Sequence, residues 1–183
     1  MNNTAIEKDV SYIRTQYWNK MSQYKFDLLY YGFYVEKCAF IMRVLKSISI
    51  GLTTLCTACC MKWSGNQILV TICGILIIAA QVYNAISQFI PYEKRKSELI
   101  ALSNDIEKIY TDMERTWRQI ASEKLSSYKS IDDKLHSYIT SWEDKQRYYF
   151  KDDSLPYDRK VTDKATREAD KYLNNLAEGN YAE

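Results

Sequence analysis

The sequence predicts an all-α membrane protein, in which a two-helix transmembrane hairpin joins long amphipathic cytoplasmic helices that form a helical bundle or coiled coil. Uninterrupted apolar sequence is concentrated in residues 38–92, although the mean hydropathy of the whole chain is −0.41. Outside this region apolar residues recur every three or four positions, which is the period of an α-helix. The chain has only 5 Gly and 2 Pro, which leaves few places for tight turns and favours long helices.

The first expected element is an amphipathic cytoplasmic helix over residues 1–37. Thr4 and Glu7 fit a capping box, in which the two side chains satisfy free amides at a helix start. The polar N-terminus lacks the layout of a cleaved signal peptide, so we expect residue 1 to belong to the mature protein. One apolar stripe follows the helix and ends near Val35. Its members are Ile6, Val10, Ile13, Tyr17, Met21, Tyr24, Leu28, Tyr31 and Val35.

The transmembrane hairpin is expected within residues 38–92, with spans at 44–61 and 68–90. The second span has 23 residues without a charge and would reach roughly 34 Å, enough to cross the hydrocarbon core. The first span is less apolar because it contains Lys46, but a lysine near the end of a span can extend to the headgroups. Residues 62–66 form the polar turn between the spans.

Basic residues predict the topology of this hairpin. Lys37, Arg43 and Lys46 flank one outer end and residues 94–96 flank the other, whereas the connecting turn has the single Lys62. By the positive-inside rule, a multi-pass chain with both termini in the cytoplasm is expected.

A long cytoplasmic helical region is expected over residues 93–150, after a kink at Pro91. An apolar seam at steps of three and four predicts packing against the N-terminal helix and against other copies of the chain, and hence a homo-oligomer. The seam comprises Leu99, Leu102, Ile106, Ile109 and Met113, continues to Trp117 and Ile120, and is followed by a second set at Ile131, Leu135, Tyr138 and Trp142. Residues 151–183 are expected to form a linker and a short helix from residue 162 to 178, which Gly179 ends.

Polar residues within the predicted spans are the candidate functional residues, because hydrocarbon satisfies no isolated amide or hydroxyl. They fall on one face of each span: Lys46, Ser49, Thr53 and Thr57 in the first, and Gln81, Asn84 and Gln88 in the second. Two interpretations are open. These residues either hold the two helices of one hairpin together or line a pore between several hairpins.

Other function classes find little support in the sequence. The net charge of +2 and the mixed charges argue against direct binding of nucleic acid. We expect no enzyme and no cofactor, because no phosphate-binding, dinucleotide, hydrolase or zinc-protease motif occurs. His136, the only histidine, has no identifiable metal or nucleophile partner, so no metal site is expected either.

The order of these elements resembles the SLATT family of two-transmembrane proteins in prokaryotic conflict systems. The resemblance covers residues 1–150: an amphipathic helix to Val35, a hairpin with a short turn at residues 62–66, and a long cytoplasmic helix from Tyr92. It implies a pore-forming or membrane-perturbing effector that oligomerises in the inner membrane. Such an effector permeabilises the bilayer during phage infection and so kills or arrests the cell.

The resemblance also implies control by a regulatory protein or a nucleotide signal from a neighbouring defence gene. The alternative function is a non-conducting, membrane-anchored helical scaffold or adaptor that binds a cytoplasmic partner. In both cases the lipid bilayer is an expected partner.

Overall fold

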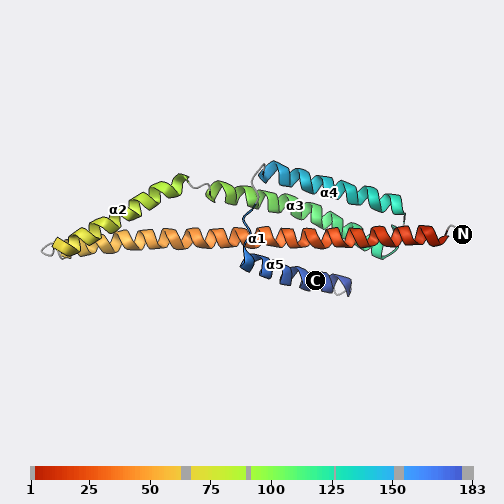
Figure 1. The fold of residues 1–183 in the computed structure, drawn as a ribbon, viewed down its shortest axis with the longest axis horizontal. Helices are drawn as coiled ribbons and strands as arrows, with labels where there is room; N and C mark the ends of the chain where they lie inside the picture. Colours follow the sequence, from red (N-terminus) through yellow and green to blue (C-terminus); the bar gives the residue numbers. More distant parts are fainter. Residues whose placement is uncertain (1–2, 63–66, 90–91, 126, 151–154, 179–183) are drawn as a thin grey trace. The chain divides into compact units, whose positions relative to one another are not determined.

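The computed structural model of this protein describes residues 3–62, 67–89, 92–125, 127–150 and 155–178, and within these residues it is helical without a strand. The helices are α1 (Asn3–Lys62), α2 (Gln67–Phe89), α3 (Tyr92–Ala121), α4 (Tyr128–Phe150) and α5 (Arg159–Ala177) (Figure 1). The predicted all-α fold is confirmed.

The chain divides into two compact units. Unit 1 comprises Met1–Val35 and Glu98–Glu183, and unit 2 comprises Glu36–Ser97. The N-terminal half of α1, most of α3, and all of α4 and α5 belong to unit 1. The C-terminal half of α1 and α2 belong to unit 2.

Helix α1 is longer than the sequence analysis predicted. We expected an amphipathic helix that ends near Val35 and a separate span from residue 44, but one helix of 60 residues runs through both. Both prolines of the chain, Pro91 and Pro156, lie outside this range, so no residue removes a helical hydrogen bond from it. The change from an apolar stripe to continuously apolar sequence therefore does not mark a helix end. It coincides with the boundary between unit 1 and unit 2 after Val35.

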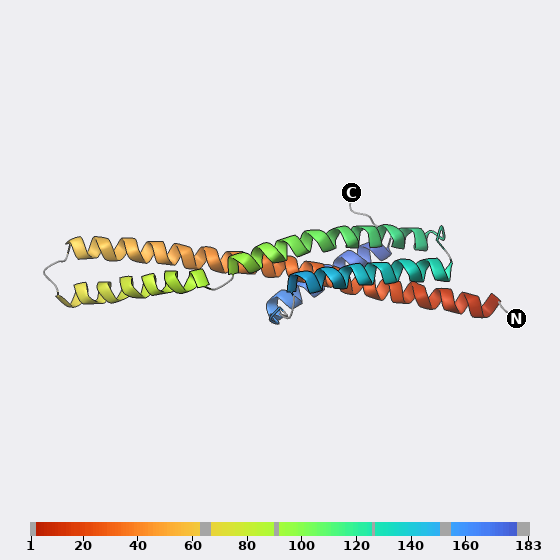
Figure 2. The same cartoon turned by 90° about the horizontal axis from the view of Figure 1, so that it is seen from above.

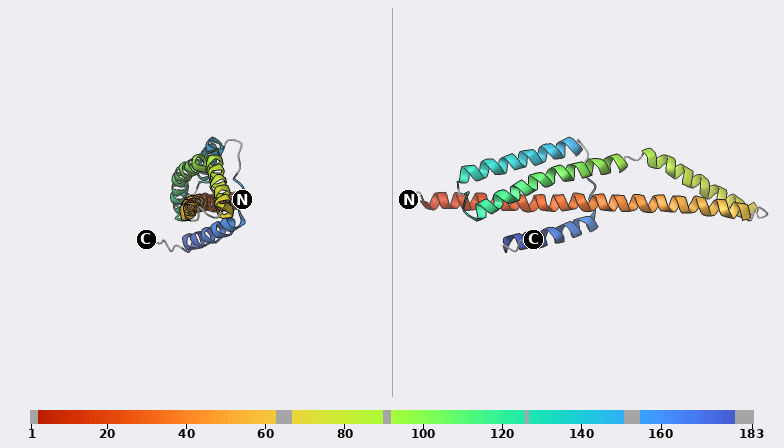
Figure 3. Two further views of the ribbon diagram at one scale, coloured as in Figure 1. Left: turned by 90° about the vertical axis from the view of Figure 1, so that its left-hand side faces the viewer. Right: turned by 180° about the vertical axis from the view of Figure 1, so that it is seen from behind.

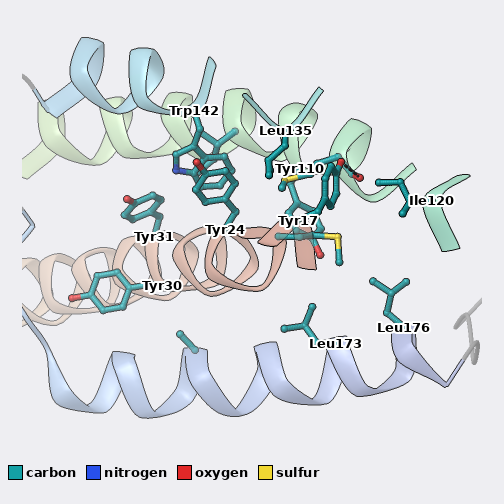
Figure 4. Packing of buried hydrophobic residues seen from close by; sticks show 14 of the residues in the cluster. Tyr17, Tyr24, Tyr30, Tyr31, Tyr110, Ile120, Leu135, Trp142, Leu173 and Leu176 are labelled. Atoms are coloured by element: carbon teal, nitrogen blue, oxygen red, sulfur yellow. Dashed lines mark hydrogen bonds between the residues drawn. The ribbon is translucent and has the colours of Figure 1, made fainter. Parts of the chain in front are cut away.

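The core of unit 1 is built around α1. In Figures 1 and 3, α4 and α5 lie on opposite sides of its N-terminal half. Towards α4, the ring of Tyr24 stacks on Trp142 with 4.1 Å between centroids and an interplanar angle of 2° (Figure 4). Towards α3, the Tyr17 hydroxyl donates to the carbonyl of Met113 at 2.8 Å. The predicted packing of the N-terminal helix against the helix after Pro91 is confirmed.

The residues expected to form an oligomer seam are core residues of a single chain. Leu102, Ile106 and Met113 are fully buried, Leu99 is almost so, and Ile109 packs at the edge of the same cluster. The seam is therefore covered within one chain, and a homo-oligomer stays a prediction. The sequence alone does not show how the other helices of unit 1 pack around α3.

Residues 93–150 do not form one long helix. Helix α3 ends at Ala121, and Glu123 adopts a left-handed backbone conformation with φ of 59°. The amide of Leu125 then donates to the carbonyl of Gln119 at 3.1 Å, which closes the end of α3. Helix α4 folds back on α3, where the hydroxyls of Thr116 and Tyr138 lie 2.9 Å apart.

The C-terminal helix begins three residues earlier than residue 162, where it was expected. The side chain of Asp158 caps α5 by accepting a hydrogen bond from the amide of Val161 at 3.0 Å. Such a cap satisfies an amide that has no partner within the helix. The described part of the helix ends at Ala177, and the predicted end residue, Gly179, lies outside the described residues.

Unit 2 is a helical hairpin, in which α2 returns along the C-terminal half of α1 (Figure 2). Lys62 of the predicted turn belongs to α1, whereas residues 63–66 and the predicted kink at Pro91 lie outside the described residues. Within the part of the chain that the structure describes, no helix combines the length and the apolar character needed to cross a bilayer. The helices of the hairpin are therefore established, and their insertion in a membrane stays a prediction.

Candidate functional site

The surface of unit 2 is apolar on both of its helices. Large aliphatic and aromatic side chains that would be buried in a soluble core are exposed here, with exposed fractions as high as 73% at Ile68 and 62% at Ile78. Exposed members are Phe40, Ile41, Val44, Ile48 and Ile50 on α1, and Ile68, Ile72, Ile75, Leu76, Ile78 and Val82 on α2. Single exposed apolar residues are ordinary, but a group of this size marks a contact with lipid or with another protein.

Small side chains form the buried side of α2. Cys73 and Ala80, two helical turns apart, are the buried residues among those of α2 whose side chains are described. Small residues such as these allow two helix backbones to approach closely. The hairpin therefore closes along the line through Cys73 and Ala80 and leaves its larger side chains facing outward.

Gln81 lies beside this line but is exposed. This exposure argues against the interpretation that its side chain holds the hairpin together. Lys46 is also exposed, on α1. The side chains of the other predicted members of the two polar faces, Ser49, Thr53, Thr57, Asn84 and Gln88, lie outside the described residues.

A cluster in unit 1 that the sequence analysis missed joins three helices around Lys25. The ammonium of Lys25 lies 3.5 Å from the ring centroid of Tyr172 on α5 and 4.9 Å from that of Tyr110 on α3. The hydroxyl of Tyr172 donates to Glu114 at 2.6 Å, and Arg118 pairs with the same carboxylate. Burial lowers the pKa of Lys25, and the neighbouring Glu114 partly opposes that shift.

These residues carry no common sequence signal. Tyr110 and Glu114 are one turn apart on α3, but Lys25 and Tyr172 lie far from them and from each other in the chain. Only the packing of α1, α3 and α5 brings the four side chains together. We refer to Lys25, Tyr110, Glu114 and Tyr172 as the Lys25 cluster.

A second aromatic surface of α1 lies outside the predicted apolar stripe. It consists of Phe26, Tyr30 and Phe33, and we call it the aromatic face. The Tyr30 hydroxyl donates to the carbonyl of Pro156 at 3.0 Å and accepts from the amide of Asp158 at 3.2 Å. The ammonium of Lys164 lies 3.8 Å from the ring centroid of Phe33. The aromatic face is thus covered by α5 and by the segment that leads into it.

Asp27 gives the stability of unit 1 a pH dependence. Burial raises its pKa from 3.8 to about 6, and Lys20 opposes that shift. Because the folded pKa is raised, the stabilisation from the protonated carboxyl is fully present below the unfolded pKa. It is lost as the pH rises through about 6.

We expect Asp27→Asn to stabilise unit 1 at pH 7.5 by about 1–2 kcal/mol, since partial exposure screens some of the shift, and to change stability little at pH 4. Chemical denaturation at both pH values measures the difference. Asp133→Asn, an exposed aspartate on α4, is the matched control. Equal effects of Asp27→Asn at both pH values would contradict this role.

The described residues include no cluster of side chains that could bind a metal ion. His136 is exposed on α4, and no group of three or more His, Cys, Asp or Glu in the described ranges could hold a metal ion. Comparison with protein-family models, curated proteins and solved structures gave no match to this chain. The resemblance to the SLATT layout therefore stays an expectation that rests on the order of the elements.

Proposed function

We propose that this protein is a membrane-perturbing effector of the bacterial inner membrane, in which unit 2 is the membrane-embedded part and several hairpins assemble into a pore. Unit 1 forms the cytoplasmic bundle that receives the activating signal. As the SLATT resemblance implies, activation follows phage sensing by a neighbouring defence gene and leads to cell death or arrest.

The exposed apolar surface of unit 2 carries this proposal. A bilayer can cover outward-facing side chains of both helices at once, whereas water would penalise each by about 1.5–3 kcal/mol relative to burial. The sequence supports the same placement, because residues 68–90 contain no charged residue.

Gln81 distinguishes a pore from a simple anchor. It lies near the middle of the predicted second span, where an unpaired amide that faces lipid costs several kcal/mol. Since α1 of its own hairpin leaves this side chain exposed, the amide needs another hairpin or a water-filled lumen. Assembly of several copies supplies both.

We expect Gln81→Leu to reduce toxicity and loss of membrane potential when the protein is induced together with its genetic neighbours. The change lines the lumen with hydrocarbon and favours its dewetting, while expression and oligomer size stay unchanged. A membrane-potential dye in growing cells gives the readout. Val82→Leu, one position away on the apolar surface, is the control and should retain full activity.

The double change of Gln81 and Asn84 to Leu should be at least as inactive as the single change. Full activity of both variants would place this face at a helix contact and remove it from the pore. A membrane potential that survives every activating condition would remove the effector function altogether.

The second candidate is a non-conducting membrane-anchored scaffold, and one observation favours it. The seam from Leu99 to Met113 is covered within one chain, so unit 1 needs no second copy to complete its core. A scaffold would keep its activity in Gln81→Leu, because its hairpin serves only as an anchor. The same experiment therefore separates the two candidates.

A further inference from the structure

Helix α5 packs on the rest of unit 1 through five buried apolar side chains. Its buried residues are Val161, Ala165, Ala169, Leu173 and Leu176, so two of its five buried side chains are single methyl groups. Figure 4 shows Leu173 and Leu176 directed from α5 towards α1. Because apolar stabilisation scales with buried area, Ala165 and Ala169 contribute less to this contact than Val161, Leu173 and Leu176 do.

The Lys25 cluster adds a polar contact that depends on charge. Glu114 is only 8% exposed, and its partners Arg118 and Tyr172 come from its own helix and from α5. Removal of one partner from a buried charged network leaves the others uncompensated. The docking of α5 should therefore respond strongly to the charge of Lys25.

This network is also incompletely paired. The hydroxyl of Tyr110 is buried and, within the part of the chain that the structure describes, has no hydrogen-bond partner. A buried polar atom without a partner costs free energy in the closed arrangement. The docked position of α5 is thus held by five apolar side chains, two of them alanines, and by a polar network in which the buried Tyr110 hydroxyl lacks a partner among the described residues.

Release of α5 would uncover the aromatic face of α1. Phe26, Tyr30 and Phe33 would then need a new cover, and the α4 side of α1 is already filled by Tyr24 and Trp142. The aromatic face is complementary to α5 in its contacts. The Lys164 ammonium lies over the Phe33 ring, and the Tyr30 hydroxyl hydrogen-bonds to the carbonyl of Pro156, just before α5. A second copy of the chain presents the same helix.

We propose that α5 is an exchangeable helix, which covers the aromatic face of its own chain while Lys25 holds Tyr172 and docks on the aromatic face of a second copy after release. The exchange joins copies through unit 1 without disturbing the buried seam. It does not depend on membrane insertion by unit 2, so the two proposals can fail separately.

A complementation experiment with the full chain in detergent tests this exchange. The first variant, Leu173→Asp with Leu176→Asp, keeps the aromatic face but disables α5. The second, Tyr30→Asp with Phe33→Asp, disables the face but keeps α5 and carries a photo-crosslinking residue at position 160, an exposed position one turn before Lys164. Each variant lacks one half of the contact between α5 and the aromatic face, so only a mixture can pair an intact α5 with an intact face.

We expect a crosslink from position 160 of the second variant to the region of Phe33 in the first, located by mass spectrometry. Mapping to this position separates exchange from any assembly through unit 2. A mixture in which the second variant also carries the two α5 changes should give no such crosslink. Absence of the crosslink in the first mixture, with α3 and α4 still protected from hydrogen exchange in both variants, would overturn the proposal.

The charge of Lys25 is tested in otherwise unchanged chains. We expect Lys25→Gln to speed hydrogen exchange of the α5 amides about tenfold, through loss of a desolvated cation–π contact, and to leave α4 unaffected. Lys25→Arg should restore most of the protection because it keeps the cation. Lys129→Gln, on the exposed side of α4, is the matched control. Equal exchange rates in Lys25→Gln and in the control would remove Lys25 from the proposal.

Discussion

Trp142→Ala is expected to destabilise unit 1 by about 3–5 kcal/mol, the usual cost of removing a large aromatic side chain from a core. Trp142 is 1% exposed and stacks face to face with Tyr24, so its loss leaves a cavity between α1 and α4. This stack of Tyr24 on Trp142 holds α4 against α1 (Figure 4). Denaturation followed by circular dichroism, with hydrogen exchange of the α4 amides, measures the effect.

Trp142→Phe provides a sharp comparison. The indole nitrogen of Trp142 is buried and has no hydrogen-bond partner in the described residues, so phenylalanine keeps much of the stacking and removes an unpaired donor. We expect this variant to lose less than about 1.5 kcal/mol. His136→Ala, an exposed position on α4, should be neutral. A loss in Trp142→Ala no larger than in His136→Ala would show that the stack does not stabilise unit 1.

Ile75→Asp combined with Ile78→Asp is expected to abolish insertion of unit 2 in membranes. The two side chains are 61% and 62% exposed on α2, where the proposed function places them against lipid. A carboxylate near the bilayer centre costs about 2.5–3.5 kcal/mol, so two of them cost about 5–7 kcal/mol. The double variant should be released from membranes by alkaline extraction, whereas the unchanged chain should resist it.

Two controls make this result specific to unit 2. Ile100→Asp introduces one carboxylate of the same kind at a position of unit 1 that is 41% exposed. It should leave membrane association unchanged. Ile75→Leu with Ile78→Leu should also behave like the unchanged chain. If the double Asp variant resists extraction as well as these controls do, the apolar surface contacts something other than lipid.

Local sequence patterns were sufficient to predict which face of the N-terminal helix is buried. The stripe that contains Ile13, Tyr17 and Tyr24 was predicted from its period alone, and these residues are buried in unit 1. Asp158, by contrast, falls in the predicted linker before residue 162, although it is the cap of α5. Its neighbours Pro156 and Tyr157 resemble a turn, and a cap is distinguished from a turn residue only by the helix that follows.

By itself, the sequence determined the all-α class, the stripe on α1 and the apolar composition of the hairpin, because these depend on helical period and on residue type. The tertiary structure decided which partner covers each stripe. The seam at Leu102 and Ile106 is equally apolar whether a second copy or α1 covers it, and only packing shows that the cover is internal. The Lys25 cluster depends on packing for the same reason: cation–π contacts and buried hydrogen bonds act over a few ångströms, and folding alone brings residues so distant in the chain that close.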